Sequence, residues 1–335
     1  MLQDRIKITD NYNRPIEYMR LAVTDRCNLR CFYCMPEEGI KYLPKKALLT
    51  YEEMERLVRV TSEMGVTKVR ITGGEPFVRK GLIEFLERIR ANTAIEKINI
   101  TTNGVLTQQY IPQLKALGIT DINLSIDTLD RDRFFKITRR DELPKVLDTL
   151  HNMLDEGFRV KINAVVMEGK NTEDIYELAK FTEQHPVEVR FIEEMPFNGE
   201  GNHYPVLNWN FKKILEELQQ HFPAINKLPT EKAATAIKYQ IPGHAGNVGI
   251  IAAFSRTFCG TCNRIRLTAQ GTLKTCLYDS GVLDLREILR SGADDEVLKT
   301  ALVGAFKSRA KDGFEAEKNR PQENKVSESM STIGG

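Results

Sequence analysis

The six cysteines are the residues best suited to chemistry, and they form two groups of three. The first group, Cys27, Cys31 and Cys34, has the spacing C-x3-C-x2-C, so one short loop offers three thiolates to a metal centre. A structural zinc site usually has four ligands, and the first histidine in the chain is His151. The spacing therefore favours a 4Fe-4S cluster with one iron left open, over a disulfide or chance burial of the thiols.

The second group, Cys259, Cys262 and Cys276, has the spacing C-x2-C-x13-C. It predicts another three-thiolate cluster, and a zinc site completed by His244 stays open as the alternative. The alternating residues 263–268 predict a strand with Arg264 and Arg266 on one face. Two guanidinium groups on one face suit a polyphosphate, although arginines on a surface more often form salt bridges.

The elements that must position these residues follow a βα rhythm from residue 17 to about 193. Short β-branched runs alternate with amphipathic stretches, which is typical of parallel α/β folds. Thr50 and Glu53 form a capping box at the start of the first helix. The predicted strands are 18–24, 68–72, 97–101, 121–126, 160–166 and 188–192, and the predicted helices are 51–64, 80–91, 107–117, 143–156, 173–185 and 210–221. Six such units predict an open α/β barrel, because a closed barrel of this kind needs eight.

Polar and glycine residues collect where each predicted strand ends. In parallel α/β folds ligands bind at the carboxyl ends of the strands. The first cysteine loop follows strand one and Gly-Gly-Glu-Pro (73–76) follows strand two, while later strands carry Thr101, Ser125, Lys161 and Arg190 and lead into Met195. We therefore expect one site at this end of the barrel.

Composition limits the classes of protein that remain. The 335-residue chain has a formal net charge of +2, which argues against a broad nucleic-acid-binding face. No apolar stretch approaches the roughly 18 residues of a membrane span, and charges at the N-terminus argue against a signal peptide. We expect a cytoplasmic protein that binds neither membranes nor nucleic acids.

The domain organisation is predicted from where the βα rhythm lapses. We expect a barrel over residues 1–222, a smaller cluster-binding domain over 223–311, and a flexible tail over 312–335 that ends in Gly334 and Gly335. The tail is polar and poor in aromatic residues, which is typical of disorder.

The first cysteine loop resembles the signature of the radical S-adenosylmethionine (SAM) superfamily. The match includes the aromatic Tyr33 just before the last cysteine and the glycine motif one βα unit later. The resemblance implies the partial (βα)6 TIM-type barrel of that superfamily and an open iron that chelates SAM. It assigns SAM contacts to Tyr33, Gly74, Ser125 and Met195.

With the second cysteine group, the chain resembles the GTP 3',8-cyclase family over essentially its full length. The resemblance implies two 4Fe-4S clusters, with SAM at the first and the guanine base of GTP at the second. It assigns GTP contacts to Arg20, Arg70, Thr101, Lys161, Arg190, Arg264, Ile265 and Arg266. Several arginines and a lysine could balance a triphosphate that carries about four negative charges.

The resemblance further implies a reaction and its partners. GTP would be cyclised to 3',8-cyclo-7,8-dihydroguanosine 5'-triphosphate while SAM is cleaved to 5'-deoxyadenosine and methionine, at the start of molybdenum cofactor biosynthesis. Gly334 and Gly335 would reach the active site and be needed for activity. A flavodoxin- or ferredoxin-type donor would supply electrons, and cyclic pyranopterin monophosphate synthase would act downstream of a monomer or homodimer. The alternatives are a peptide-modifying radical SAM maturase, and an electron carrier or zinc-stabilised binding module.

Overall fold

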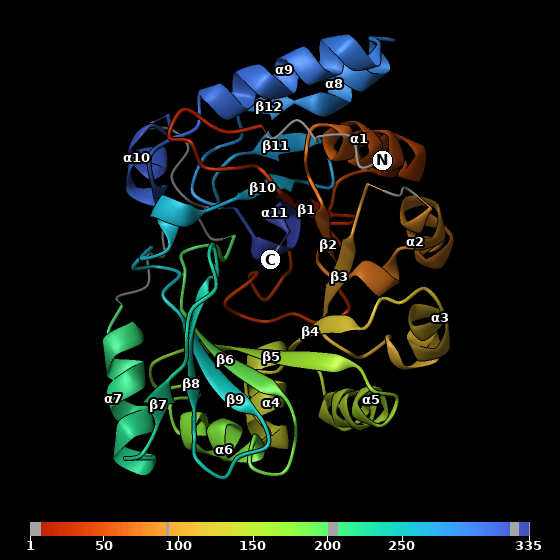
Figure 1. Cartoon of the computed structure of the whole chain (residues 1–335). Coiled ribbons are helices and arrows are strands. Elements are labelled where there is room, and N and C mark those ends of the chain that lie inside the picture. Colours follow the sequence, from red (N-terminus) through yellow and green to blue (C-terminus); the bar gives the residue numbers. More distant parts are fainter. Residues whose placement is uncertain (1–7, 92–93, 200–206, 322–327, 335) are drawn as a thin grey trace, which may run out of the picture. The chain divides into compact units, whose positions relative to one another are not determined.

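The computed structural model describes residues 8–91, 94–199, 207–321 and 328–334 (Figure 1). The chain divides into two compact units, and each is built from segments that are far apart in the sequence. Unit 1 comprises Met1–Asn28, Ile40–Ile100 and Cys259–Gly335, and unit 2 comprises Leu29–Gly39 and Thr101–Phe258.

Unit 1 is an α/β unit whose parallel strands come from both ends of the chain. Its strand order is β12-β11-β10-β1-β2-β3, and the four strands β10, β1, β2 and β3 run parallel. β11 and β12 are antiparallel additions at the β10 side. The strands are β1 (Tyr18–Ala22), β2 (Lys68–Thr72), β3 (Lys97–Thr102), β10 (Arg264–Leu267), β11 (Thr272–Lys274) and β12 (Leu283–Asp284).

The two faces of this sheet differ because successive strand residues point to opposite sides. Met19 and Leu21 of β1, and Val69 and Ile71 of β2, are buried on the face covered by helices. Figure 1 shows α1 (Tyr51–Glu63) and α2 (Leu82–Arg90) on one side of β1–β3 and α11 (Met330–Ile333) on the other. The other helices of this unit are α8 (Leu285–Arg290), α9 (Asp295–Lys307) and α10 (Gly313–Lys318).

Unit 2 has the same plan of four parallel strands with two antiparallel ones at an edge. Its order is β4-β5-β6-β9-β8-β7, with β4, β5, β6 and β9 parallel. The strands are β4 (Asp121–Ser125), β5 (Arg159–Val166), β6 (Glu188–Glu193), β7 (Asn226–Lys227), β8 (Ala236–Gln240) and β9 (Asn247–Ile251). The helices are α3 (Ile111–Ala116), α4 (Arg131–Thr138), α5 (Leu143–Asp155), α6 (Asp174–Phe181) and α7 (Phe211–His221).

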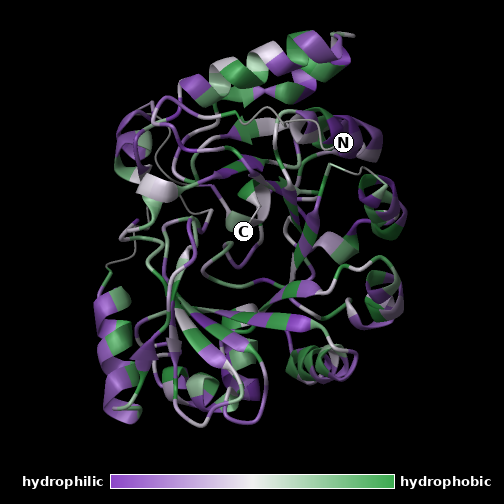
Figure 2. Ribbon diagram, in the orientation of Figure 1, coloured by the Kyte–Doolittle hydropathy of each residue, from purple (hydrophilic) through white to green (hydrophobic). Residues whose placement is uncertain are grey.

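The amphipathic pattern that predicted the helices is visible in the folded chain. Figure 2 shows hydrophilic and hydrophobic stretches alternating along the helices. In α5, for example, Leu143, Val146, Leu150 and Met153 are buried, at helical spacing. Burial of such a stripe is the main stabilisation of a helix of this length.

All six predicted strands are present, each within two residues of its predicted bounds. The predicted helices are present too, and the capping box of Thr50 and Glu53 is confirmed at the start of α1. The sequence analysis missed α4, and it missed that β9 and β10 continue the parallel pairing of β6 and β1. Among the described residues, no helix is long and apolar enough to cross a membrane.

The compact units do not coincide with the expected boundaries at 222/223 and 311/312. β8 and β9 pair with the strands of unit 2, whereas the chain from Cys259 onward returns to unit 1. The expected tail contains α10 and α11. The contact pattern follows strand pairing, which joins segments distant in the sequence and leaves no local sign at a boundary.

Candidate active site

The first cysteine loop follows β1 and is held by tight backbone turns. The amides of Cys34 and Met35 both donate to the carbonyl of Cys31, each at 3.0 Å, which draws Cys31 and Cys34 into one turn in unit 2. Cys27 belongs to unit 1. None of the three cysteines is in a disulfide bond and all three are partly buried, so each can serve as a metal ligand in its thiolate form.

Tyr33 anchors this loop through a partner that the sequence analysis did not identify. Its hydroxyl donates to Asp127 Oδ2 at 2.9 Å, and the Val165 amide donates to Asp127 Oδ1 at 2.8 Å. Burial, and then the charge of Asp127, raises the pKa of Tyr33 well above its usual value. Burial raises the pKa of Asp127 to about 6. Asp127 follows β4 directly, so the signal available was a carboxylate at the carboxyl end of a predicted strand.

Gly73 and Gly74 let the loop after β2 lie against the start of the first cysteine loop. The Gly74 amide donates to the Thr24 carbonyl at 2.9 Å. A Cβ on Gly74 would lie 2.4 Å from the Arg26 carbonyl oxygen, and one on Gly73 would lie 2.5 Å from the Thr24 oxygen. Both glycines therefore allow a close approach to the chain's own backbone. Any side chain at either position would push these loops apart.

The second cysteine group lies within unit 1, and its thiols interact electrostatically. Burial raises the pKa of Cys276 to about 11, with Asp279, Cys259 and Cys262 adding to the effect. Burial also acts on Cys262, but the charges of Arg264 and Arg309 lower its pKa to about 6. The three thiols therefore influence one another electrostatically, and Cys262 lies in a local positive field. His244, the residue considered for a zinc site, belongs to unit 2, where its Nδ1 lies 2.9 Å from Thr182 Oγ1.

A buried charged network braces the loop of Cys259 and Cys262. Arg309 donates to Cys262 Sγ at 3.1 Å and to the Cys262 carbonyl at 3.0 Å. Arg14 donates to the Cys259 carbonyl at 3.1 Å. Asp10, which has no exposed surface, joins both arginines, at 2.6 Å from Arg14 and 3.4 Å from Arg309. Asp10 and Arg14 lie far in the sequence from Arg309 and from the cysteines, so no local motif could have identified the network.

Four basic side chains stand side by side across the sheet of unit 1. Strand register places Lys274 opposite Arg266, Arg266 opposite Arg20, and Arg20 opposite Arg70, with Asn99 next in line. Because laterally paired residues share a face, we call these five residues the basic row. Arg264 lies two residues before Arg266 on the same face, as predicted, and Ile265 is buried on the opposite face. Thr101 follows Asn99 by two residues on β3, so it continues the face of the basic row.

The charges of the basic row lie close enough together to influence one another. Burial, and then the charge of Arg266, lowers the pKa of Arg20 well below its usual value. Burial and the charge of Arg264 lower the pKa of Arg266 to about 10. Burial acts to raise the pKa of Tyr18, but the charges of Arg70, Arg20 and Lys68 lower it to about 7. The Tyr18 hydroxyl accepts a hydrogen bond from Arg70 Nε at 2.5 Å. Positive charges held together in this way favour a bound polyanion.

The C-terminal segment lies on the same face as the basic row. Gly334 has φ +78°, and its carbonyl accepts a hydrogen bond from Arg266 Nη1 at 2.8 Å. A Cβ on Gly334 would lie 2.7 Å from Thr72 Oγ1 and 3.1 Å from the Ala22 Cβ, so this position excludes side chains. Gly335 lies outside the described residues.

In unit 2, the predicted polar residues also share a sheet face. Ser125, Asn163 and Arg190 stand side by side across β4, β5 and β6, and Lys161 lies two residues before Asn163. Glu188 accepts a hydrogen bond from Arg190 Nε, and the charges of Arg190 and Lys161 lower its pKa against the effect of burial. The sequence analysis missed this carboxylate. Met195 follows β6 and is partly buried.

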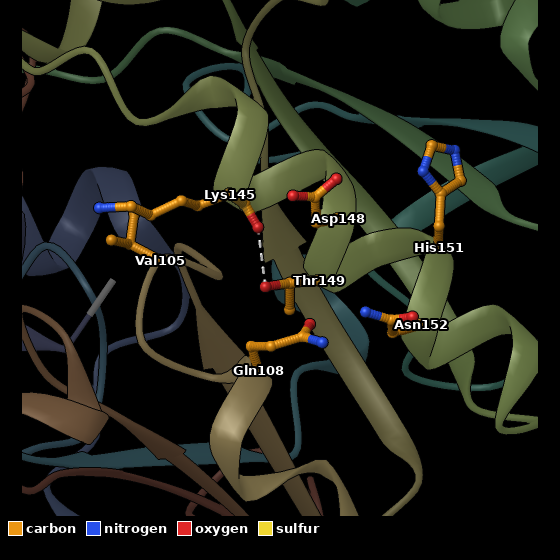
Figure 3. Close-up of a pocket in the computed structure, with 7 residues that line it drawn as sticks. All are labelled: Val105, Gln108, Lys145, Asp148, Thr149, His151 and Asn152. Carbon is orange, nitrogen blue, oxygen red and sulfur yellow. Dashed lines mark hydrogen bonds between the residues drawn. The ribbon is translucent and has the colours of Figure 1, made fainter.

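Two further observations limit the candidate site. Within the described ranges, no group of three or more His, Cys, Asp or Glu side chains could hold a metal ion. A pocket of about 370 Å³ lies along α5 (Figure 3), and it contains none of the predicted site residues. Its lining consists of Val105, Gln108, Lys145, Asp148, Thr149, His151 and Asn152.

Comparisons with known proteins agree with this fold. Residues 21–182 match the radical SAM superfamily, and residues 187–314 match the family "Molybdenum Cofactor Synthesis C". A crystal structure of Streptococcus suis SuiB bound to S-adenosylmethionine has a TM-score of 0.61, with 17% identity, over 89% of this chain and 69% of that chain. The class that the fold and the first cysteine loop define is thus the radical SAM proteins, and the predicted α/β fold class is confirmed.

Sequence relatives define the family within that class. The chain is 42% identical to the GTP 3',8-cyclase of Desulforamulus reducens, over 90% of this chain and 93% of that protein. It is 40% identical to the GTP 3',8-cyclase of Heliobacterium modesticaldum, over 90% and 92% of the two chains. The chain belongs to the GTP 3',8-cyclase family.

Other relatives are longer. Molybdenum cofactor biosynthesis protein 1 of Bos taurus is 42% identical over 91% of this chain but only 48% of its own length. The chain therefore spans about half the length of the first such relatives, with comparable coverage of the mouse and human proteins.

Proposed function

We propose that this chain is a radical SAM enzyme that converts GTP to 3',8-cyclo-7,8-dihydroguanosine 5'-triphosphate, the first reaction of molybdenum cofactor biosynthesis. The observation that carries the proposal is that one compact unit holds both the second cysteine group and the basic row. Arg264 links the two, because its charge acts both on Cys262 and on Arg266. GTP requires such an arrangement, in which a cluster binds the guanine base and neighbouring cations bind the triphosphate.

The cysteines fit the cofactors of the family. Each group provides three cysteines that are in no disulfide bond, and Arg309 donates the kind of hydrogen bond to a ligand sulfur that stabilises a thiolate. We propose that Cys27, Cys31 and Cys34 hold the cluster that binds SAM, and that Cys259, Cys262 and Cys276 hold the second. When bound, SAM and its reduced cluster supply a 5'-deoxyadenosyl radical, which is the oxidising chemistry of this class.

The protein's own residues position and neutralise the substrate. Arg20, Arg70, Arg264 and Arg266 bind the triphosphate with forked donors. Its negative charge relieves the repulsion that, in addition to burial, lowers the pKa values of Arg20 and Arg266. Thr101, Lys161 and Arg190 complete the GTP contacts in the proposal, and Tyr33, Gly74, Ser125 and Met195 provide those to SAM. Gly334 and Gly335 would fill space beside the substrate without adding a side chain.

Anaerobic incubation of the reconstituted chain with SAM, dithionite and GTP tests this function. We expect 5'-deoxyadenosine and the cyclised nucleotide in equal amounts. A peptide maturase would leave GTP unchanged, and an electron carrier or zinc module would form no 5'-deoxyadenosine. Zinc at both cysteine groups after anaerobic purification would contradict the proposal.

Several finer points are predictions from the sequence alone. They are a flavodoxin- or ferredoxin-type electron donor, consumption of the product by cyclic pyranopterin monophosphate synthase, a monomeric or homodimeric state, and a cytoplasmic location. Each is open to direct measurement with purified components or by fractionation of cells.

A further inference from the structure

Lys274 is a fully buried cation whose partner comes from the C-terminal segment. Its side chain is 1% exposed, and its Nζ lies 3.0 and 2.8 Å from the two carboxylate oxygens of Glu328. Burial lowers the pKa of Lys274, and the charge of Glu328 opposes that effect. Lysines are almost never fully buried without a partner. The Glu328 carboxylate therefore compensates the positive charge of Lys274, which is buried in the sheet and cannot be hydrated.

Arg320 joins the same carboxylate to the loop of the third cysteine. Its Nη2 donates to Glu328 at 3.1 Å, and its Nη1 donates to the carbonyls of Tyr278 and Asp279 at 3.2 and 3.0 Å. Asp279 in turn accepts the backbone amide of Cys276 at 2.8 Å. A continuous set of hydrogen bonds thus runs from the Cys276 turn to Glu328. We call Glu328, Lys274 and Arg320 the tail clasp.

The segment after Glu328 is short and held at its far end as well. Ser329 caps α11 by accepting the Ser331 amide at 3.2 Å, and Ile333 is buried. Gly334 then reaches Arg266, whose register neighbour on β11 is Lys274. The segment therefore starts and ends on two adjacent members of the basic row.

We propose that Glu328 is a positioning residue: the tail clasp fixes the C-terminal segment so that Gly334 lies against Arg266, and it ties that placement to the turn that carries Cys276. The proposal rests on the proposed function, in which this segment serves the active site. One carboxylate facing two buried cations cannot be replaced by a neutral side chain without leaving a buried charge uncompensated. Glu328 therefore acts through Gly334 and Arg266, without touching substrate.

The test compares Glu328→Gln with the unaltered chain, both as the full-length holoenzyme. Hydrogen exchange of the C-terminal peptide, read by mass spectrometry, should become about tenfold faster or more, because charged hydrogen bonds are lost. Turnover should fall roughly tenfold while the KM for GTP changes little, as expected for a residue that acts through others. The control is Glu296→Gln, which removes a carboxylate from the exposed ion pair with Lys299 and should change neither quantity.

Glu328→Asp is the second variant, and it keeps the proposal testable if Glu328→Gln does not fold. Its shorter carboxylate can reach only one of the two cations, so exchange and turnover should be intermediate. Unchanged exchange in both variants would overturn the tail clasp. Hydrogen exchange can be measured without turnover. If the unaltered chain fails to cyclise GTP, that result contradicts the proposed function but does not affect the exchange test of the tail clasp.

Discussion

Buried charges in unit 1 serve two different purposes. Asp10 partly offsets the charges of Arg14 and Arg309, and the two arginines donate to backbone carbonyls of the second cysteine group. In the basic row, by contrast, like charges face one another, and burial together with the charge of Arg266 lowers the pKa of Arg20. The first arrangement stabilises a loop, whereas the second is prepared for an anion.

Replacing Arg309 by Met should weaken retention of the second cluster. The variant loses the hydrogen bond to Cys262 Sγ and the positive charge that stabilises this thiolate. Mutation of a residue that hydrogen-bonds to a metal ligand typically lowers metal affinity or activity by about 10- to 100-fold. Iron remaining after a chelator challenge measures the effect, with Arg131→Gln as a control at an exposed arginine. Equal iron loss in both variants would contradict the assigned role.

Tyr18 predicts a pH dependence of stability. Its pKa of about 7 lies below the usual value of 10, so the folded state favours the phenolate. The stabilisation is therefore fully present above pH 10 and is lost as the pH falls through 7. Urea unfolding of the nucleotide-free chain should show a stability difference between the native protein and Tyr18→Phe that grows from pH 6 to about pH 9. A difference independent of pH would show that neighbouring cations do not stabilise the phenolate.

Local sequence patterns predicted those helices and strands that interactions between nearby residues determine. The strands of the βα units and the capping box at Thr50 were predicted because alternation and capping are encoded within a few residues. The helix α4 was missed because half of its short sequence, RDRFFKIT, is charged, although Asp130 caps it by accepting a hydrogen bond from the Arg133 amide. The pairing of β10 with β1 joins strands distant in the chain and leaves no periodic signal.

The residues of the candidate site were likewise predicted only where a local pattern marks them. Arg264 and Arg266 were placed correctly on one face, because strand alternation alone decides it. The sequence did not predict the roles of Lys274, Glu328, Asp10 and Arg309, because each depends on an ion-pair partner in another segment of the chain. Composition cannot reveal such pairs, because isolated charged residues in a sequence most often lie on the surface.

A pair of glycine substitutions tests the packing of the loop after β2. Gly74→Ala would place a Cβ 2.4 Å from the Arg26 carbonyl, and such overpacking typically costs about 1–3 kcal/mol. Gly304→Ala, in α9, meets no atom within 4 Å and should stabilise the helix slightly. Denaturant unfolding of both variants gives the comparison. Equal midpoints would mean that the loop adjusts without cost.

For the whole molecule, the positions of the charged side chains matter more for anion binding than the net charge. The net charge is only +2, yet four cations of the basic row and Arg264 share one face of unit 1. Long-range attraction to anions is therefore weak, and binding must depend on short contacts within the row. The units that create this face are not the contiguous domains expected from the sequence.

Nucleotide affinity should therefore depend on the number of phosphates. We expect affinity to fall from GTP to GDP to GMP, by roughly tenfold for each phosphate, since each loses charge-assisted hydrogen bonds. Calorimetry on the anaerobic holoenzyme measures this order. Arg70→Gln should reduce the differences, while Arg131→Gln at the exposed pair with Asp141 should leave them unchanged. Guanosine binding as tightly as GTP would contradict a triphosphate site.

The pairing of β10 with β1 also has a consequence for biosynthesis of the chain. β1 is translated long before its neighbour and must wait until Arg264–Leu267 have been made, with all of unit 2 translated in between. Until then one edge of the nascent sheet is exposed to other strands, which is a condition that favours aggregation. A growing polypeptide of this kind would depend on holding chaperones, or on early folding of unit 2, to reach its native state.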